Sequence, residues 1–181
     1  MRTVLHLGSI ISLLRIPLAV AFLVAFDLSN FTSLIIAATT AILAQVLDHL
    51  DGWITRRVSQ PSLEGWLFDS VSDRAFYIAA ILAFGREYGI PDLLVWAAVL
   101  REVSLYAVRI SVGDFSKRLP QSRTLALIHA GLIRIAIALG SGLPLIFGLS
   151  TTMFVAPATI SALLLASILL GFLTLWRIAR Q

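Results

Sequence analysis

The sequence predicts an all-α, polytopic integral membrane protein with six transmembrane helices, and three observations lead to this fold class. Of its 181 residues, 59% are hydrophobic and 13% are charged, and the mean hydropathy is +0.93, far from the profile of an average soluble domain. Apolar runs of about 20 residues, the length that lets a helix cross the hydrocarbon core, recur along the chain. The segments between these runs are short, so little of the protein should lie outside the bilayer.

Each expected helix corresponds to one apolar run. The runs cover residues 9–26, 33–54, 66–84, 92–112, 125–147 and 153–176. The first run contains Ala19-Val20-Ala21, a small-x-small pattern that also marks signal-peptide cleavage sites. Arg15 interrupts the apolar centre of this run, however, and apolar residues continue to Phe26. We therefore expect a retained helix.

The chain is expected to form a single membrane domain over residues 1–181. No Ser/Pro/Gly-rich linker and no convincing internal repeat divides it, so a second domain would have no visible boundary. Cysteine is absent, which excludes disulfides and thiolate metal sites.

Basic residues predict the orientation in the membrane. With the N-terminus inside, eight Lys and Arg residues fall in cytoplasmic segments and Arg86 falls on the opposite side. The positive-inside rule then places both termini in the cytoplasm. Topology and attraction to anionic lipids account for the net charge of +4, and nothing indicates nucleic-acid binding. The eight residues are Arg2, Arg56, Arg57, Lys117, Arg118, Arg123, Arg177 and Arg180.

Four aspartates occupy the cytoplasmic ends of the second and third expected helices. Asp48 and Asp51 are spaced i, i+3, and Asp69 and Asp73 are spaced i, i+4, so each pair lies on one face of its helix. An antiparallel hairpin would bring the two pairs together as a four-carboxylate cluster. Each charge at membrane depth costs roughly 2.5 to 3.5 kcal/mol, so the cluster requires a neutralising partner.

Two kinds of partner could neutralise the cluster. Arg56, Arg57 and Arg74 are close in sequence and could form a structural ion-pair network. Carboxylate oxygens also suit hard cations such as Mg²⁺, Mn²⁺ or Ca²⁺, and two divalent ions would balance four negative charges. We favour metal. The side chain of His49 points about 100° away from that of the preceding residue, Asp48, around the helix axis. We therefore exclude His49 from the ligand set.

The spacing of these residues resembles the signature of the CDP-alcohol phosphotransferase family. The chain reads Asp48-x-x-Asp51-Gly52-x-x-Thr55-Arg56, then eight residues, then Gly65-x-x-x-Asp69-x-x-x-Asp73. Seven of the eight fixed positions match the signature. The exception is Thr55, where the family usually has a small Ala beside the nucleotide.

The resemblance extends beyond the signature. "SIISLLR", Ser9 to Arg15, is similar to an Asn-x-x-Thr-x-x-Arg segment with Ser at both polar positions. "REVSLYAVR", Arg101 to Arg109, resembles an Arg-Glu-six-residues-Arg element of the phosphatidylglycerophosphate synthase branch, and Arg123-Thr124 resembles its Lys-Thr pair. In contrast, "DSVSDR" at residues 69–74 is closer to the inositol-phosphate-using branch.

The resemblance implies an activity and a set of site residues. The activity is transfer of a phosphatidyl group from CDP-diacylglycerol to an alcohol, with release of CMP, by a six-helix domain that usually dimerises in a membrane such as the bacterial inner membrane. Two divalent cations, Mg²⁺ or Mn²⁺, would be held by the four aspartates, with Asp73 also acting as the base. The residues implied at the CDP-lipid are Ser12, Gly52, Thr55, Arg56 and Gly65. Gly52 and Gly65 could instead mark helix ends, and Arg56 could serve topology alone.

Intramembrane basic residues bear on the identity of the acceptor. Arg109 could pair with Glu102 two turns earlier on nearly the same helix face. Four other basic residues have no obvious acidic partner in the sequence: Arg101, Lys117, Arg123 and Arg134. Unpaired guanidinium groups suit a phosphorylated alcohol, and we favour glycerol 3-phosphate over inositol 1-phosphate. Arg134 could alternatively snorkel toward a lipid headgroup. The residues expected at the acceptor phosphate are Arg101, Arg109, Lys117, Arg123 and Arg134.

A divalent-cation transporter or channel is the alternative from another functional class, since intramembrane carboxylates also bind permeating metals. All four aspartates lie near one face of the membrane, and the opposite ends of the spans carry no comparable acidic residues. This placement disfavours a permeation path. Metal-dependent CMP release would support the enzyme, whereas metal flux without CMP would support transport.

Overall fold

The computed structural model describes residues 7–58, 63–112 and 120–179, and every element in these ranges is an α-helix. Next to the gaps and at residue 126, some helical residues are described by their backbone alone: 7–9, 55–58, 63–66, 109–112, 120–123, 126 and 178–179. The helices are α1 (Leu7–Leu13), α2 (Arg15–Ala25), α3 (Phe31–Val58), α4 (Leu63–Tyr88), α5 (Asp92–Val112), α6 (Pro120–Phe147) and α7 (Leu149–Ala179). The predicted all-α fold class is confirmed.

Helices lie at all six predicted positions. Three are long and apolar enough to cross a membrane along Phe31–Ile54, Leu127–Phe147 and Leu149–Arg177, and Ile10–Ala25 forms a shorter apolar stretch. By contrast, α4 carries Asp69, Asp73 and Arg74 among its apolar residues, and α5 likewise contains charged side chains. The protein is an integral membrane protein, and the count of six crossing segments stays a prediction.

The first predicted helix is divided at Leu14. Pro17 has no N–H to donate to the carbonyl of Leu13, and a proline ring also clashes with the carbonyl four residues earlier. These two effects predict a break near Leu13. The break lies there, since α1 ends at Leu13 and α2 begins at Arg15. The N–H of Leu14 reaches the carbonyl oxygens of Ile10 and Ile11, each at 3.2 Å. Arg15 is therefore the first residue of a new helix.

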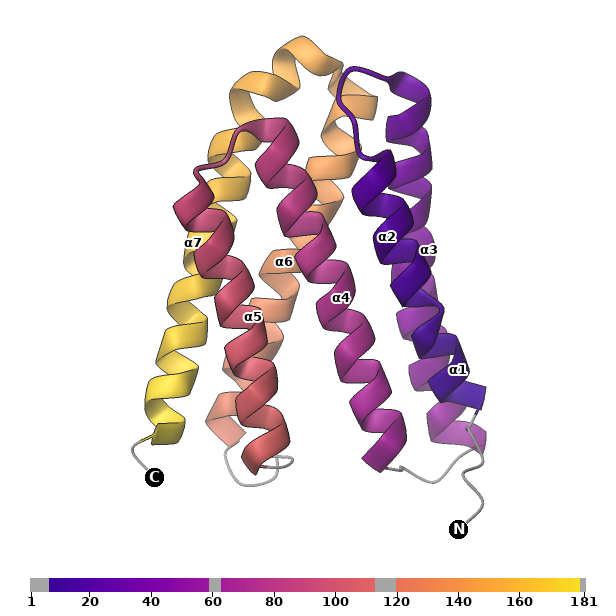
Figure 1. The fold of residues 1–181 in the computed structure, drawn as a ribbon, viewed down its shortest axis with the longest axis vertical. Helices are drawn as coiled ribbons and strands as arrows, with labels where there is room; N and C mark the ends of the chain where they lie inside the picture. Colours follow the sequence, from indigo (N-terminus) through magenta and orange to yellow (C-terminus); the bar gives the residue numbers. More distant parts are fainter. Residues whose placement is uncertain (1–6, 59–62, 113–119, 180–181) are drawn as a thin grey trace. The chain divides into compact units, whose positions relative to one another are not determined.

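The chain divides into two compact units, residues Met1–Ala80 and Ile81–Gln181, with the boundary inside α4. The prediction of a single domain is not tested by this division and stays a prediction. In the first unit, α1 and α2 pack along α3 (Figure 1). The buried positions of α3 include Ala37, Ala41 and Ala44, and such small residues let helices approach closely in a membrane. The Phe22 ring of α2 lies 5.5 Å from that of Phe76 on α4, which connects α4 to this core.

In the second unit, α7 packs against both α6 and α5. Gly148 separates α6 from α7 with a φ of 75°, a left-handed conformation in which glycine has no Cβ to clash. The ring of Phe84 lies against Gly140 of α6, where an added Cβ would come within 2.5 Å of Phe84 Cζ. The hydroxyl of Tyr88 donates a hydrogen bond to the carbonyl of Gly140. Close contacts at glycine therefore bring the end of α4 onto α6.

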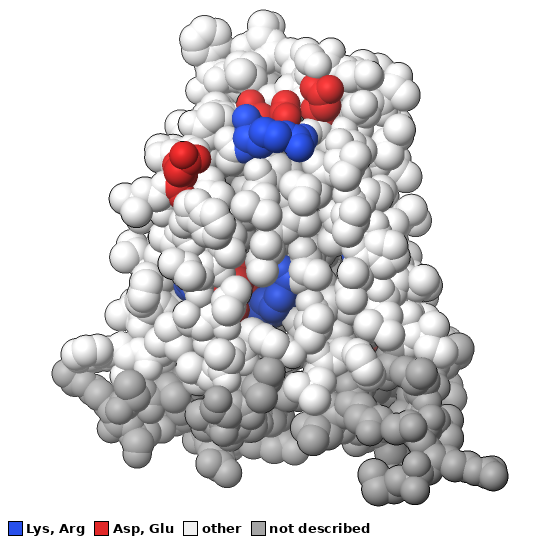
Figure 2. Space-filling model, in the orientation of Figure 1, with Lys and Arg blue, Asp and Glu red and all other residues white. Residues whose placement is uncertain are grey.

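The outer surface of the described residues is predominantly apolar. Figure 2 shows Lys, Arg, Asp and Glu as small groups on an otherwise uncharged face. Large apolar side chains are exposed on several helices, including Val24, Leu93 and Phe154. Exposed apolar surface of this extent is typical of a protein that faces lipid.

Candidate active site

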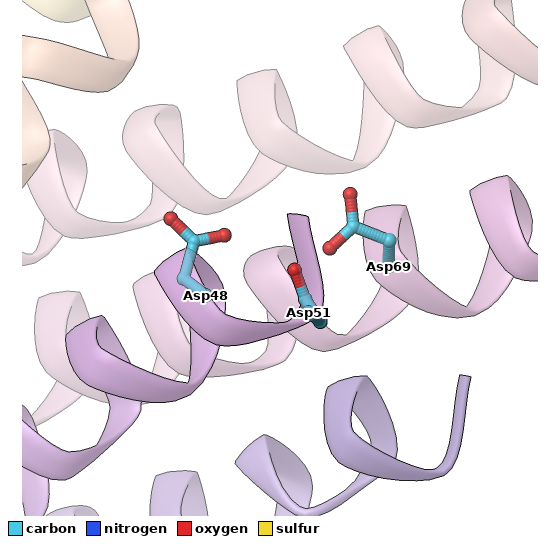
Figure 3. Close-up of side chains that lie close together, drawn as sticks. All are labelled: Asp48, Asp51 and Asp69. Atoms are coloured by element: carbon cyan, nitrogen blue, oxygen red, sulfur yellow. The ribbon is translucent and has the colours of Figure 1, made fainter. Parts of the chain in front are cut away.

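The four aspartates meet in the first unit. Asp48 and Asp51 project from the second half of α3, and Asp69 and Asp73 project from the first half of α4. The carboxylates of Asp48, Asp51 and Asp69 face a common space (Figure 3), and each offers an oxygen within 4.8 Å of the others. The expectation that the i, i+3 and i, i+4 pairs converge is confirmed.

Arg15 of α2 lies at the centre of this cluster and contacts all four carboxylates. Its Nη1 is 2.9 Å from Asp48 Oδ1 and also donates to Asp73 Oδ1. Its Nη2 is 2.7 Å from Asp51 Oδ2 and also donates to Asp69 Oδ1. Each terminal nitrogen therefore joins one aspartate of α3 to one aspartate of α4.

Ser12, which precedes the break between α1 and α2, also points into the cluster. Its hydroxyl donates to Asp51 Oδ2 at 2.7 Å, and the side chain is buried. Asp51 thus receives hydrogen bonds from both Ser12 and Arg15. Hydrogen bonds from two directions hold a carboxylate in one orientation.

Burial differs among the four carboxylates. The side chain of Asp51 is 8% exposed, those of Asp48 and Asp73 are 19% and 21% exposed, and that of Asp69 is 44% exposed. Arg15 is 2% exposed. The cluster is therefore closed around Asp51 and open on the side of Asp69, and a ligand would approach from the open side.

The donor set fits hard divalent cations. All of the candidate ligand atoms are carboxylate oxygens, the donors that Mg²⁺ and Mn²⁺ prefer. The oxygens of Asp48, Asp51 and Asp69 are close enough to share an ion, since metal–oxygen distances of roughly 2.0 to 2.6 Å place opposite ligands about 4 to 5 Å apart. His49, which we excluded, is exposed, with its Nδ1 2.8 Å from the carbonyl oxygen of Gln45.

Arg15 is the site residue that the sequence interpretation did not assign. The sequence also offers Arg56, Arg57 and Arg74 as basic partners of the aspartates. The structure places Arg15 at the centre of the cluster, and the charge of Arg74 also acts on the adjacent Asp73. The side chains of Arg56 and Arg57 lie outside the described residues. A signal was present, because an arginine within an apolar run needs a partner at membrane depth. Its long side chain connects positions 33 to 58 residues apart, which local spacing does not predict.

The residues expected at the CDP-lipid are only partly described. Ser12 borders the aspartates, and Gly52 is half-buried on α3 directly after Asp51. Thr55, Arg56 and Gly65 lie in helical segments next to the gap at 59–62, and their side-chain environments fall outside the described residues.

Arg101, expected at the acceptor phosphate, has an acidic partner in the structure. The interpretation of the sequence, which found no obvious partner for it, was wrong on this point. It donates through Nη1 to Oε1 of the adjacent Glu102, and both side chains are buried. His129 Nε2 of α6 lies 3.0 Å from the same Glu102 oxygen, and His129 Nδ1 lies 2.8 Å from Ser167 Oγ of α7. Neighbours on a helix do not face each other, but the length of the arginine side chain lets it fold back.

The structure describes the side chain of one of the remaining acceptor residues. Arg134 is half-buried on α6. The side chains of Arg109 and Arg123, and the whole of Lys117, lie outside the described residues. Pairing of Arg109 with Glu102 is therefore untested, although Arg101 and His129 already contact that carboxylate.

Comparisons with known proteins identify a family and several relatives. A family model described as CDP-alcohol phosphatidyltransferase matches residues 5–179. A protein of Pseudomonas fluorescens named CDP-diacylglycerol–glycerol-3-phosphate 3-phosphatidyltransferase is 28% identical over 121 residues, which cover 66% of this chain and 62% of the relative. A protein of the same name from Pectobacterium atrosepticum is 26% identical over 62% of this chain and 63% of its own length. One from Yersinia enterocolitica is 24% identical over 76% and 74%. The chain thus spans less than two thirds of the length of the first two relatives.

Proposed function

The chain belongs to the CDP-alcohol phosphatidyltransferase family, and from this premise we propose that it transfers a phosphatidyl group from CDP-diacylglycerol to glycerol 3-phosphate and releases CMP. The observation that carries the proposal is the convergence of Asp48, Asp51, Asp69 and Asp73 from two helices onto one partly open space. The names of the three relatives support glycerol 3-phosphate as the acceptor.

The four aspartates have two roles in this proposal. Asp48, Asp51 and Asp69 hold the cations, helped by Asp73, and Ser12 orients Asp51 through its hydrogen bond. When bound, two Mg²⁺ or Mn²⁺ ions would polarise the diphosphate and stabilise the charge on departing CMP. Metal dependence is part of the proposal and is supported by the oxygen-only donor set.

Asp73 is the proposed base. The acceptor hydroxyl attacks the phosphorus of the phosphatidyl group, and the bond between that phosphorus and the CMP oxygen breaks with its electron pair going to CMP. Asp73 accepts the proton that the hydroxyl loses. Its partial exposure, 21%, is compatible with contact to a bound hydroxyl.

Two groups of residues are proposed to bind the substrates. Ser12, Gly52, Thr55, Arg56 and Gly65 line the CDP-lipid, with the two glycines admitting close backbone approach. Arg101, Arg109, Lys117, Arg123 and Arg134 provide positive charge for the acceptor phosphate. For Arg101 this role requires the guanidinium to bind the phosphate while it also neutralises Glu102.

The proposed setting is the bacterial inner membrane, with both termini and the aspartates on the cytoplasmic side. The distribution of Lys and Arg supports this orientation. A homodimer in the membrane is also proposed, on the family resemblance alone.

An acceptor comparison tests the function. Purified protein in detergent would be given labelled CDP-diacylglycerol, Mg²⁺ or Mn²⁺, and one acceptor at a time: glycerol 3-phosphate, inositol 1-phosphate, glycerol or inositol. We expect a lipid product and stoichiometric CMP with glycerol 3-phosphate. Product with inositol 1-phosphate alone would move the protein to the other branch, and equal use of the unphosphorylated alcohols would contradict the basic acceptor pocket. Manganese flux into liposomes without CMP would favour a transporter.

A further inference from the structure

The contacts of Arg15 bear on how the aspartates bind metal. The guanidinium donates to the oxygens of Asp48, Asp51 and Asp69, the three residues whose carboxylates could share an ion. It also donates to Asp73. Because Arg15 is 2% exposed, it fills the interior of the cluster instead of bordering it.

Arg15 neutralises the cluster incompletely. Its single positive charge faces four carboxylates, so an excess of negative charge remains when all four are ionised. Two divalent cations would balance the four charges, but a guanidinium and a metal ion repel each other at close range and both bind through the same carboxylates. Arg15 and the metal ions would therefore compete for these carboxylates.

We propose that Arg15 is a positioning residue that gathers the four carboxylates in the metal-free protein and competes with divalent cations for them. This inference rests on the metal binding in the proposed function. Metal binding requires the guanidinium to leave its four partners, so the apparent metal affinity is lowered by the fraction of molecules in which Arg15 occupies the cluster. The contacts across α3 and α4 also keep the ligands close together before any metal arrives.

The test compares Mn²⁺ binding by the full-length protein in detergent, followed by the loss of the free Mn²⁺ signal in electron paramagnetic resonance. Arg15→Gln removes the competing charge. Arg86→Gln is the matched control, because it removes one positive charge from an exposed ion pair with Glu87, 13 residues after Asp73 in the sequence. If Arg15 occupies the cluster in about nine molecules of ten, Arg15→Gln should bind Mn²⁺ about tenfold more tightly, and Arg86→Gln should bind as the unmodified protein does.

Thermal unfolding provides a second readout. In chelator, Arg15→Gln should unfold at a lower temperature than the unmodified protein, because four carboxylates lose their shared partner. Saturating Mn²⁺ should raise its unfolding temperature by more than it raises that of the unmodified protein. A variant that folds only when Mn²⁺ is present would also support the inference.

Several outcomes would overturn the inference. Equal or weaker Mn²⁺ binding by Arg15→Gln would show that Arg15 does not compete, and the metal site of the proposed function would then still stand. Absence of Mn²⁺ binding in both proteins would remove that metal site and the competition together. If Arg15→Gln stays unfolded even in Mn²⁺, Arg15→Lys is measured in its place. Lysine keeps the charge but lacks the planar guanidinium that joins four carboxylates, so we expect Arg15→Lys to bind Mn²⁺ more tightly than the unmodified protein. Unchanged or weaker binding by Arg15→Lys would overturn the proposal.

Discussion

Asp73 and Asp48 belong to one site, and at the residue scale they differ in their proposed roles. Both receive a hydrogen bond from Nη1 of Arg15, and their side chains are similarly exposed. The contact to Arg15 and the exposure of the side chain therefore do not distinguish them. Substitution can distinguish them, because losing a proton acceptor and losing a metal ligand have different kinetic consequences.

Asp73→Asn should abolish transfer while sparing CDP-lipid binding. An amide oxygen can still coordinate weakly but cannot accept the proton of the attacking hydroxyl. We expect turnover to fall by about 10²- to 10⁴-fold, measured as CMP release, with little change in the affinity for CDP-diacylglycerol. Asp92→Asn, at an exposed position in the first turn of α5, is the control. Near-normal turnover in Asp73→Asn would remove this residue from the mechanism.

Asp48→Ala should lose metal affinity and CDP-lipid affinity together. The substitution removes one of the three carboxylates that could share an ion, and the diphosphate depends on that ion in the proposed site. Titration of Mn²⁺ and of CDP-diacylglycerol on the purified variant measures both affinities. An unchanged metal dependence would contradict the ligand assignment.

Arg109→Ala should weaken binding of the phosphorylated acceptor selectively. Losing a charge-assisted hydrogen bond of about 1.5 to 3 kcal/mol predicts a rise in the KM for glycerol 3-phosphate of roughly tenfold to over a hundredfold. The apparent affinity for CDP-diacylglycerol should stay nearly unchanged in the same assay. Equal weakening of both substrates, or unfolding, would instead favour a structural pairing with Glu102.

At the scale of elements, a proline and a set of glycines decide how the helices fit together. Pro17 ends α1 at Leu13 and lets α2 begin at Arg15, which places Ser12 and Arg15 on opposite sides of a break and both against Asp51. The six helical positions were predictable from apolar runs. The division of the first was also foreseeable, since a proline inside a helix removes a hydrogen bond and clashes with the preceding turn.

Gly140→Ala should destabilise the protein, whereas Gly142→Ala should not. Both glycines lie in α6, where alanine is intrinsically favoured over glycine by about 1 kcal/mol. A Cβ at position 140 would lie 2.5 Å from Phe84 Cζ, but one at position 142 would meet nothing within 4 Å. Overpacking of this kind costs roughly 1 to 3 kcal/mol. Thermal unfolding in detergent should therefore show a lower midpoint for Gly140→Ala only, and equal midpoints would contradict the close contact.

At the scale of the whole molecule, the absence of cysteine allows orientation to be tested directly. Single cysteines at Ser29 and Gln60 introduce one thiol each into an otherwise cysteine-free chain. The positive-inside rule places residue 60 in the cytoplasm and residue 29 on the opposite side. In intact cells, a membrane-impermeant maleimide should label Ser29→Cys at once and Gln60→Cys only after permeabilisation. The reverse pattern would invert the proposed topology.

The sequence by itself determined the all-α class, the positions of the helices and the convergence of the aspartates. These features depend on hydropathy and on helical spacing, which are local properties that six apolar runs and two short motifs display in full. Helical i, i+3 and i, i+4 spacing was enough to predict that Asp48 and Asp51 share one helix face and that Asp69 and Asp73 share another.

The tertiary structure alone decided which cation sits among the aspartates and which partner Arg101 takes. Arg15 reaches across 33 to 58 residues of sequence to its four carboxylates, and Glu102 contacts both the adjacent Arg101 and His129 of another helix. The physical reason is that a long, flexible arginine side chain is directed by charge and burial, not by its position along the helix. Its partner is therefore set by whichever carboxylates the packed helices bring within reach.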